Sequence, residues 1–98
     1  MAITRVFRVR IKAELREEFE EKFADISVRE VQSASGMESV SIHRPTKWSP
    51  DEYAMITVWT DEESLASFAG ENWNQPVIPD GMEKFVQESS VAHYESWD

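Results

Sequence analysis

Residues 52–59 form a predicted β-strand whose two faces are both apolar, and this places the strongest constraint on the fold. A strand with one solvated face alternates apolar and polar side chains, whereas here both alternating sets are apolar. One set comprises Tyr53, Met55 and Trp59, and the other comprises Ala54, Ile56 and Val58. Both faces should be buried, so the sheet that contains this strand must be covered on each side.

A helix-start signal follows this strand directly. Thr60 and Glu63 have the spacing of a capping box, in which the hydroxyl accepts from a backbone amide and the carboxylate reaches back. Acidic residues in the first turn suit the positive end of the helix dipole, and a short helix is predicted over about 61–70. Trp59 therefore ends the strand at a strand-to-helix junction, where it either lines a ligand pocket or closes the core.

Alternation and helical spacing predict the remaining elements. The predicted strands cover residues 3–11, 37–44 and 85–97, a long helix covers about 13–33, and an irregular loop covers 71–81. Leu15, Phe19, Phe23 and Ile26 mark the buried face of the long helix. The order β-α-β-β-α-β is that of an α+β, ferredoxin-like fold with a four-stranded antiparallel sheet and two helices on one face.

The predicted architecture bears on domain count and assembly. The 98 residues are expected to form a single domain, 1–98. Because two helices cover only one face of the sheet, a second copy of the chain is the simplest cover for the other face. The sequence therefore predicts a homodimer, a dimeric α/β barrel.

The charge balance and the residue content exclude several classes of function. Nineteen acidic against ten basic residues give a net charge of −9, which repels nucleic acid and anionic membranes. The sequence contains no cysteine, so a disulfide framework, a thiol nucleophile and a thiolate metal site are excluded. No segment has transmembrane length, and the N-terminus lacks the apolar run of a signal peptide. A soluble, cytoplasmic protein is expected.

Three segments carry a resemblance to a known family: Gly36 with His43-Arg44-Pro45, Tyr53 with Val58-Trp59, and the acidic turn that runs to Phe68. With these segments in this order, the chain resembles the antibiotic biosynthesis monooxygenase-like family of the dimeric α/β-barrel superfamily. The resemblance implies a cofactor-independent monooxygenase, an oxidoreductase that acts on a small aromatic, quinol- or polyketide-like substrate. The alternative is a non-catalytic small-molecule-binding or stress-associated barrel of the same fold.

Other members of this family degrade haem, and the sequence lacks two features of that branch. The branch uses an asparagine on the first strand, a tryptophan at the end of the third strand and a histidine ligand about one helix later. Trp59 matches the tryptophan, but the first strand has no asparagine and residues 60–80 contain no histidine. No haem or other cofactor is therefore expected, and two histidines far apart in the sequence give no metal site.

A cofactor-free oxygenation needs a dry pocket, an aromatic wall and a base that titrates near neutral pH. His93 and His43 are the candidate catalytic bases, although a surface or structural histidine is the commoner role for each. The candidate substrate-binding residues lie on or after the third strand: Trp59, Tyr53, Met55, Phe68, Asn72 and Trp73. Among these, Tyr53 could instead be a rim residue and Trp73 a subunit contact, while Met55 stands where a studied relative has an asparagine.

The position of Trp59 also leads to a geometric prediction. Trp59 should line a cavity between the sheet and the second helix, with Trp73 on the loop side, because that short helix offers few apolar side chains to fill the space. Arg8 and Arg10 share a strand face and could bind an anionic substrate, although pairing with carboxylates is the simpler role.

Overall fold

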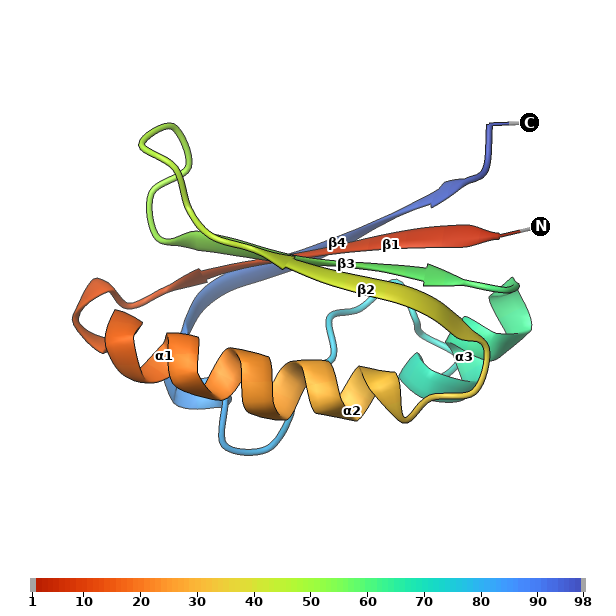
Figure 1. Ribbon diagram of the computed structural model, residues 1–98, viewed down its shortest axis with the longest axis horizontal. Coiled ribbons are helices and arrows are strands. Elements are labelled where there is room, and N and C mark those ends of the chain that lie inside the picture. The colour runs from red at the N-terminus through yellow and green to blue at the C-terminus, as the bar shows by residue number, and fades with distance from the viewer. Residues whose placement is uncertain (1, 98) are drawn as a thin grey trace.

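The computed structural model describes residues 2–97 and contains a four-stranded antiparallel sheet with its helices on one face (Figure 1). The strands are β1 (Ile3–Ile11), β2 (Met37–His43), β3 (Glu52–Trp59) and β4 (Val86–Glu95), in the order β2-β3-β1-β4. β1 and β3 are central, whereas β2 and β4 are the two edges of the sheet. The predicted ferredoxin-like α+β fold is confirmed, and β2 and β4 are slightly shorter than predicted.

The long helical run after β1 contains a π-helical turn. The run comprises α1 (Arg16–Lys22), the π turn (Phe23–Ser27) and α2 (Val28–Gln32). Its buried residues are Phe19, Phe23, Ser27 and Val31, spaced four apart. An α-helix turns once per 3.6 residues, so this spacing drifts off the sheet unless a wider turn corrects it. The Val28 amide donates to the Phe23 carbonyl, five residues back. Ser27 is buried, whereas the predicted Ile26 is only partly buried.

Two apolar clusters fill the space between the sheet and the helices. In the first, Phe19 packs on Phe23, Tyr53 and Phe85 with ring centroids 4.9, 4.7 and 5.5 Å away. The second cluster, near α3 (Glu62–Ala69), consists of Ile3, Val31, Trp59 and Leu65. Met55 packs against both clusters. The inner face of the sheet is thus divided into two halves, and the residues predicted to form one site are distributed between them.

The N-cap of α3 (Glu62–Ala69) lies one residue later than the predicted capping box. The N-cap is Asp61, whose Oδ1 accepts a 2.8 Å hydrogen bond from the Ser64 amide, and this bond lowers the pKa of the Asp61 carboxyl. Thr60 instead donates its hydroxyl to the Gly36 carbonyl over 3.1 Å. Gly36 has a φ of 85° in the turn before β2, so this contact ties that turn to the start of α3.

The sheet face opposite the helices is open (Figure 1). The strand register places half-buried apolar side chains on this face: Val6, Ala54, Ile56, Val58 and Ala92. The loop between β2 and β3 and the C-terminal segment both rise on the open side, and they carry the exposed Trp48 and Trp97, respectively. An apolar sheet face is therefore framed by two raised segments that each bear a tryptophan.

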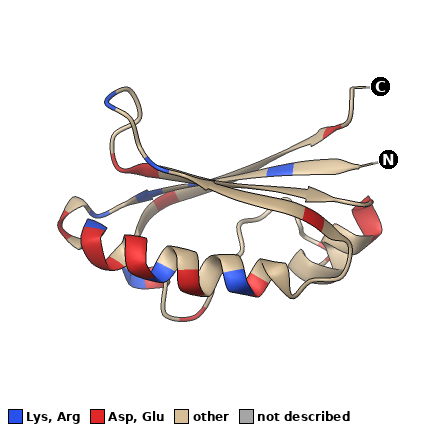
Figure 2. Ribbon diagram, in the orientation of Figure 1, with Lys and Arg blue, Asp and Glu red and all other residues tan. Residues whose placement is uncertain are grey.

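The acidic residues gather on the helical layer, most densely on α1 (Figure 2). Some are neutralised locally by ion pairs at four-residue spacing, as between Arg16 and Glu20 at 3.2 Å and between Arg29 and Asp25 at 2.5 Å. Within residues 2–97, no helix combines the length and the apolar character needed to cross a membrane.

Candidate functional site

A buried arginine lies on the inner face of the sheet beside one of the two histidines. Arg5 of β1 is 4% exposed and pairs in register with His93 of β4. Its Nη1 donates to Nε2 of the His93 ring over 3.0 Å. None of the ion pairs found among residues 2–97 involves Arg5, and burial lowers the pKa of its guanidinium.

Arg5 also holds the loop between α3 and β4 against the edge of the sheet. Its Nη1 donates to the Trp73 carbonyl over 2.5 Å and its Nη2 donates to the Gln75 carbonyl over 3.0 Å. This attachment brings the Trp73 indole against the His93 ring, with centroids 4.6 Å apart and planes at 82°, which is an edge-to-face contact. One guanidinium thus orients both aromatic side chains.

The bond from Arg5 fixes the chemical form of His93. A guanidinium has donors only, so Nε2 of His93 must accept and the proton must sit on Nδ1. Burial of the ring, and secondarily the positive charge of Arg5, lowers the pKa of His93 below its ordinary value. His93 is therefore a neutral imidazole whose Nδ1–H is a hydrogen-bond donor.

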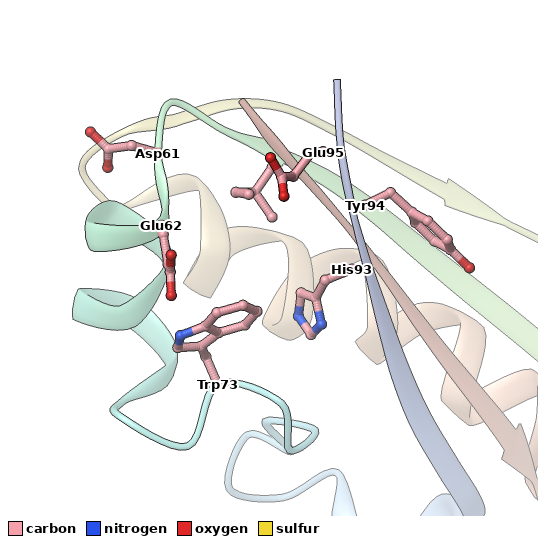
Figure 3. Close-up of a pocket in the computed structure, with 7 residues that line it drawn as sticks. Asp61, Glu62, Trp73, His93, Tyr94 and Glu95 are labelled. Carbon is pink, nitrogen blue, oxygen red and sulfur yellow. The ribbon is translucent and has the colours of Figure 1, made fainter. Parts of the chain in front are cut away.

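A pocket of about 630 Å³ opens beside this pair at the edge formed by β4 (Figure 3). Its lining residues are Ile3, Asp61, Glu62, Trp73, His93, Tyr94 and Glu95. The Trp73 and His93 side chains point toward each other from the loop and from β4, whereas the Tyr94 ring points away on the other side of the strand. The pocket therefore combines an aromatic wall, a donor from His93 and acceptor carboxylates on Glu62 and Glu95. We call it the His93 pocket.

Trp59 lies in the core next to this region. It is 0% exposed, its Nε1 donates to Thr57 Oγ1 over 2.9 Å, and the Phe68 ring packs on it with centroids 5.3 Å apart. The space expected to remain unfilled beside Trp59 is occupied by Phe68, and a void beside Phe68 and Met55 measures only about 20 Å³. A ligand could reach Trp59 only if Phe68 moved, so the binding roles predicted for Trp59, Phe68 and Met55 stay predictions.

The same packing bears on haem. A void of about 20 Å³ holds roughly one water molecule, whereas a porphyrin needs many times that volume. No histidine occurs on α3 or elsewhere in residues 60–80. The residues around Trp59 therefore do not fit a haem in this conformation.

The other predicted residues lie away from the His93 pocket. Tyr53 belongs to the first core cluster, where burial and a 2.5 Å hydrogen bond to Glu20 raise its pKa to about 12. It is a buried core residue rather than a rim residue. His43 is exposed on β2, the edge opposite β4, with Nε2 3.0 Å from Ser41 Oγ. The two histidines therefore do not share a site, and Asn72 is exposed on the loop.

Two features of the site were not anticipated from the sequence. Arg5 is the one charged member of an alternating set whose other members are Ile3, Phe7, Val9 and Ile11, and that exception is the signal that could have identified it. Glu62 and Glu95 carry no such signal, because carboxylates are frequent throughout this chain.

Arg10 pairs with Glu88 at 2.5 Å, the simpler of the two roles considered for it.

A four-stranded antiparallel sheet with helices on one face and an open second face defines a small α+β protein of the ferredoxin-like class. The family model described as "Antibiotic biosynthesis monooxygenase" matches residues 2–73. The chain belongs to this family, and the resemblance inferred from the sequence is confirmed.

Solved structures of this fold include proteins with different activities. SnoaB, a cofactor-independent oxygenase from Streptomyces nogalater, has a TM-score of 0.72 and 17% identity over 99% of this chain and 94% of its own. A heme-degrading protein from Mycobacterium tuberculosis has a TM-score of 0.67 and 22% identity over 99% and 95%. A conserved protein from Methanosarcina mazei has a TM-score of 0.71 and 18% identity over 96% and 91%. At these identities the likeness shows the fold alone, and a comparison with curated protein sequences gives no match.

Proposed function

We propose that this protein is a cofactor-independent monooxygenase that binds a small phenolic or quinol-like aromatic in the His93 pocket. The observation that carries the proposal is the pairing of Trp73 with a neutral His93, both held by the buried Arg5, at the wall of a cavity of about 630 Å³. Family membership supports the reaction class. A cytoplasmic location is part of the same proposal.

The reaction needs no reductant other than the substrate. When a phenol becomes a quinone, one atom of dioxygen enters the ring as the new carbonyl oxygen. The other atom leaves as water with the hydroxyl hydrogen and the displaced ring hydrogen, and the ring supplies all four electrons. The protein has to bind the ring, ionise the hydroxyl and exclude bulk water.

The residues of the pocket divide these tasks. Trp73 offers an apolar wall for the ring, and the Nδ1–H of His93 donates to an oxygen of the substrate. A carboxylate of Glu62 or Glu95 accepts the hydroxyl proton, since both residues line the pocket. Arg5, behind His93, adds a positive charge that favours the ionised ring. In this scheme His93 is a donor rather than the base, because its Nε2 is already engaged by Arg5.

We also propose that the protein acts as a homodimer whose two open sheet faces meet. The apolar side chains of that face, including Val6, Ile56 and Val58, would then be buried, as predicted from the two apolar faces of β3. The exposed Trp48 and Trp97 rise on the same side and would contact the partner subunit.

Oxygen uptake with naphthol, a two-ring phenol, tests the function. The wild type should consume oxygen and release naphthoquinone, and anaerobic calorimetry should show saturable naphthol binding. His93→Phe removes the donor and should weaken binding about tenfold, the value of one hydrogen bond. His93→Gln keeps an N–H donor and should retain part of the activity. His43→Gln on the opposite edge is the matched control and should behave as wild type.

The outcomes separate the possible roles. If His93→Gln is as inactive as His93→Phe although it binds naphthol, His93 is the base and the donor role is wrong. If the wild type neither binds nor oxidises naphthol or a related quinol, the proposed function fails.

Binding without turnover is the second candidate function, and one observation favours it. The Arg5 bond and the lowered pKa make His93 a weak base, so the pocket suits recognition at least as well as proton abstraction. In that case naphthol binds anaerobically and responds to His93→Phe, but no oxygen is consumed above the uncatalysed rate.

A further inference from the structure

A second pocket lies at the opposite edge of the sheet, between α1 and β2, and the proposed monooxygenase reaction does not use it. Its volume is about 280 Å³, close to the lower end of the size range of small-molecule sites. The lining residues are Glu20, Phe23, Ala24, Ile42, His43, Arg44 and Tyr53. Because β2 and β4 are opposite edges of the sheet, this pocket and the His93 pocket are separate.

The floor of the second pocket is aromatic and rigid. Phe23 and Tyr53 are 3% and 2% exposed, with ring centroids 6.1 Å apart in an edge-to-face arrangement. Both are held by the first core cluster, so their positions do not depend on a ligand. Ile42 of β2 is 40% exposed and also lines the pocket. An apolar ring would contact the edge of this closed aromatic floor and the exposed Ile42 side chain, without displacing the buried rings.

The polar part of the pocket is organised by Glu20. Its carboxylate accepts from the Tyr53 hydroxyl at 2.5 Å, from Arg16 Nε at 3.2 Å and from Arg44 Nε at 3.3 Å. These bonds, led by that of Tyr53, lower the pKa of the Glu20 carboxyl. One carboxylate therefore accepts from two arginines, and among the residues that line the pocket the charge of Glu20 is balanced by that of Arg44.

Arg44 presents unused donors at this pocket. It binds Glu20 through Nε, and no other hydrogen bond of its guanidinium is found within residues 2–97. The terminal nitrogens of an arginine form the fork that grips a carboxylate with two parallel bonds. Because Glu20 already accepts three hydrogen bonds, a hydroxyl ligand would find little free acceptor there.

We propose that this pocket, the Arg44 pocket, binds a small aromatic carboxylate. The ring lies against Phe23 and Ile42, and the carboxylate takes two hydrogen bonds from the terminal nitrogens of Arg44. Glu20 is a positioning residue, since it holds Arg44 across the opening between β2 and α1. The chemical class differs from that proposed for the His93 pocket, which takes a neutral phenol.

Titration with naphthoate, followed by backbone amide NMR, tests the assignment. Saturable shifts should appear at Phe23, Ala24, Ile42 and His43. Arg44→Gln changes an exposed position, so folding should not suffer. It should raise the dissociation constant about tenfold, because two charged hydrogen bonds to the carboxylate are lost. The matched control is Arg29→Gln, which removes another exposed arginine of an ion pair with a carboxylate on the same helical run. Its dissociation constant should stay within about twofold of wild type.

Three results would overturn the proposal. The first is the absence of saturable shifts at millimolar naphthoate. The second is a shift pattern confined to Trp73, His93 and their neighbours, which would place naphthoate in the His93 pocket. The third is equal weakening by Arg44→Gln and Arg29→Gln, which would indicate general attraction to positive charge. Failure here leaves the naphthol results on the His93 pocket unaffected.

Discussion

Replacing Arg5 with methionine should loosen the loop between α3 and β4 and change the titration of His93. Methionine keeps much of the apolar stem but has no donor and no charge. The substitution removes the bonds to the carbonyls of Trp73 and Gln75 and the bond to the His93 ring. Arg29→Met is the control, because the Arg29 side chain is exposed on the helical layer, away from both Arg5 and the open face of the sheet.

The loss of stability can be worked out from the two carbonyls that are left behind. A buried acceptor without a partner costs about 1–3 kcal/mol, and both carbonyl bonds are partly buried, so water can compensate in part. With about 1 kcal/mol for each, the free energy of unfolding should fall by about 2 kcal/mol. Relief from burying a charge reduces this figure somewhat. Arg29→Met should change it by less than about 0.5 kcal/mol.

The pH dependence has a definite sign. In the wild type the pKa of His93 lies below its ordinary value of 6.5 because the ring is buried and faces Arg5. The unfolded chain therefore takes up this proton first as the pH falls, and stability decreases below about pH 6.5 down to the pKa of the folded state. Arg5→Met removes the positive charge but leaves the His93 ring buried, so the pKa of His93 should rise partway toward 6.5. The decrease in stability at acid pH should therefore be smaller in this variant than in the wild type.

Urea denaturation at several pH values and an NMR titration of the His93 ring measure both effects. Nitrogen chemical shifts of the ring also report the tautomer, which should be Nδ1–H in the wild type. An unchanged His93 titration in Arg5→Met, or a stability loss no larger than that of Arg29→Met, would refute the roles assigned to Arg5.

Three further predictions follow from the packing and the sheet. Gly36→Ala should lower the free energy of unfolding by more than about 2 kcal/mol, because φ is positive and the new methyl group meets the Ser64 side chain, whereas Gly81→Ala, with the same sign of φ and open space, should cost only about 1 kcal/mol by denaturation. Haem should produce no saturable, stoichiometric shift of its Soret band, and such a shift would mean that a residue outside 60–80 supplies a ligand. Light scattering at micromolar concentration should give about twice the chain mass, and Val58→Glu on the open face should shift it toward the monomer, while a stable wild-type monomer would contradict the dimer.

The strands and helices could be predicted from the sequence because the patterns that mark them involve residues close together in the chain. Alternation located β1 and β3 at the bounds found in the structure, and the two apolar faces of β3 marked it as central. The order of strands and helices is compatible with only a few sheet topologies. The capping residue of α3 was misplaced by one position, since Thr60 and Asp61 are both good caps and only tertiary contact with Gly36 engages Thr60.

The candidate site brings together residues that are far apart in the sequence, and no local sequence pattern predicts such contacts. Arg5 and His93 are 88 positions apart and meet because β1 and β4 pair in one register. The same register leaves His43 on the far edge of the sheet. Phe68 fills the space beside Trp59 because the short α3 turns its ring onto the indole, a matter of packing that composition does not reveal.

The sequence by itself therefore determined the element order, the central strand and the family, because periodicity and capping act between neighbours in the chain. The tertiary structure alone decided which predicted residues share a cavity. It placed Trp73 and His93 together and moved Tyr53 to a second pocket with Arg44. The physical reason is that side-chain encounters are set by sheet register and by the filling of the core, which depend on all elements at once.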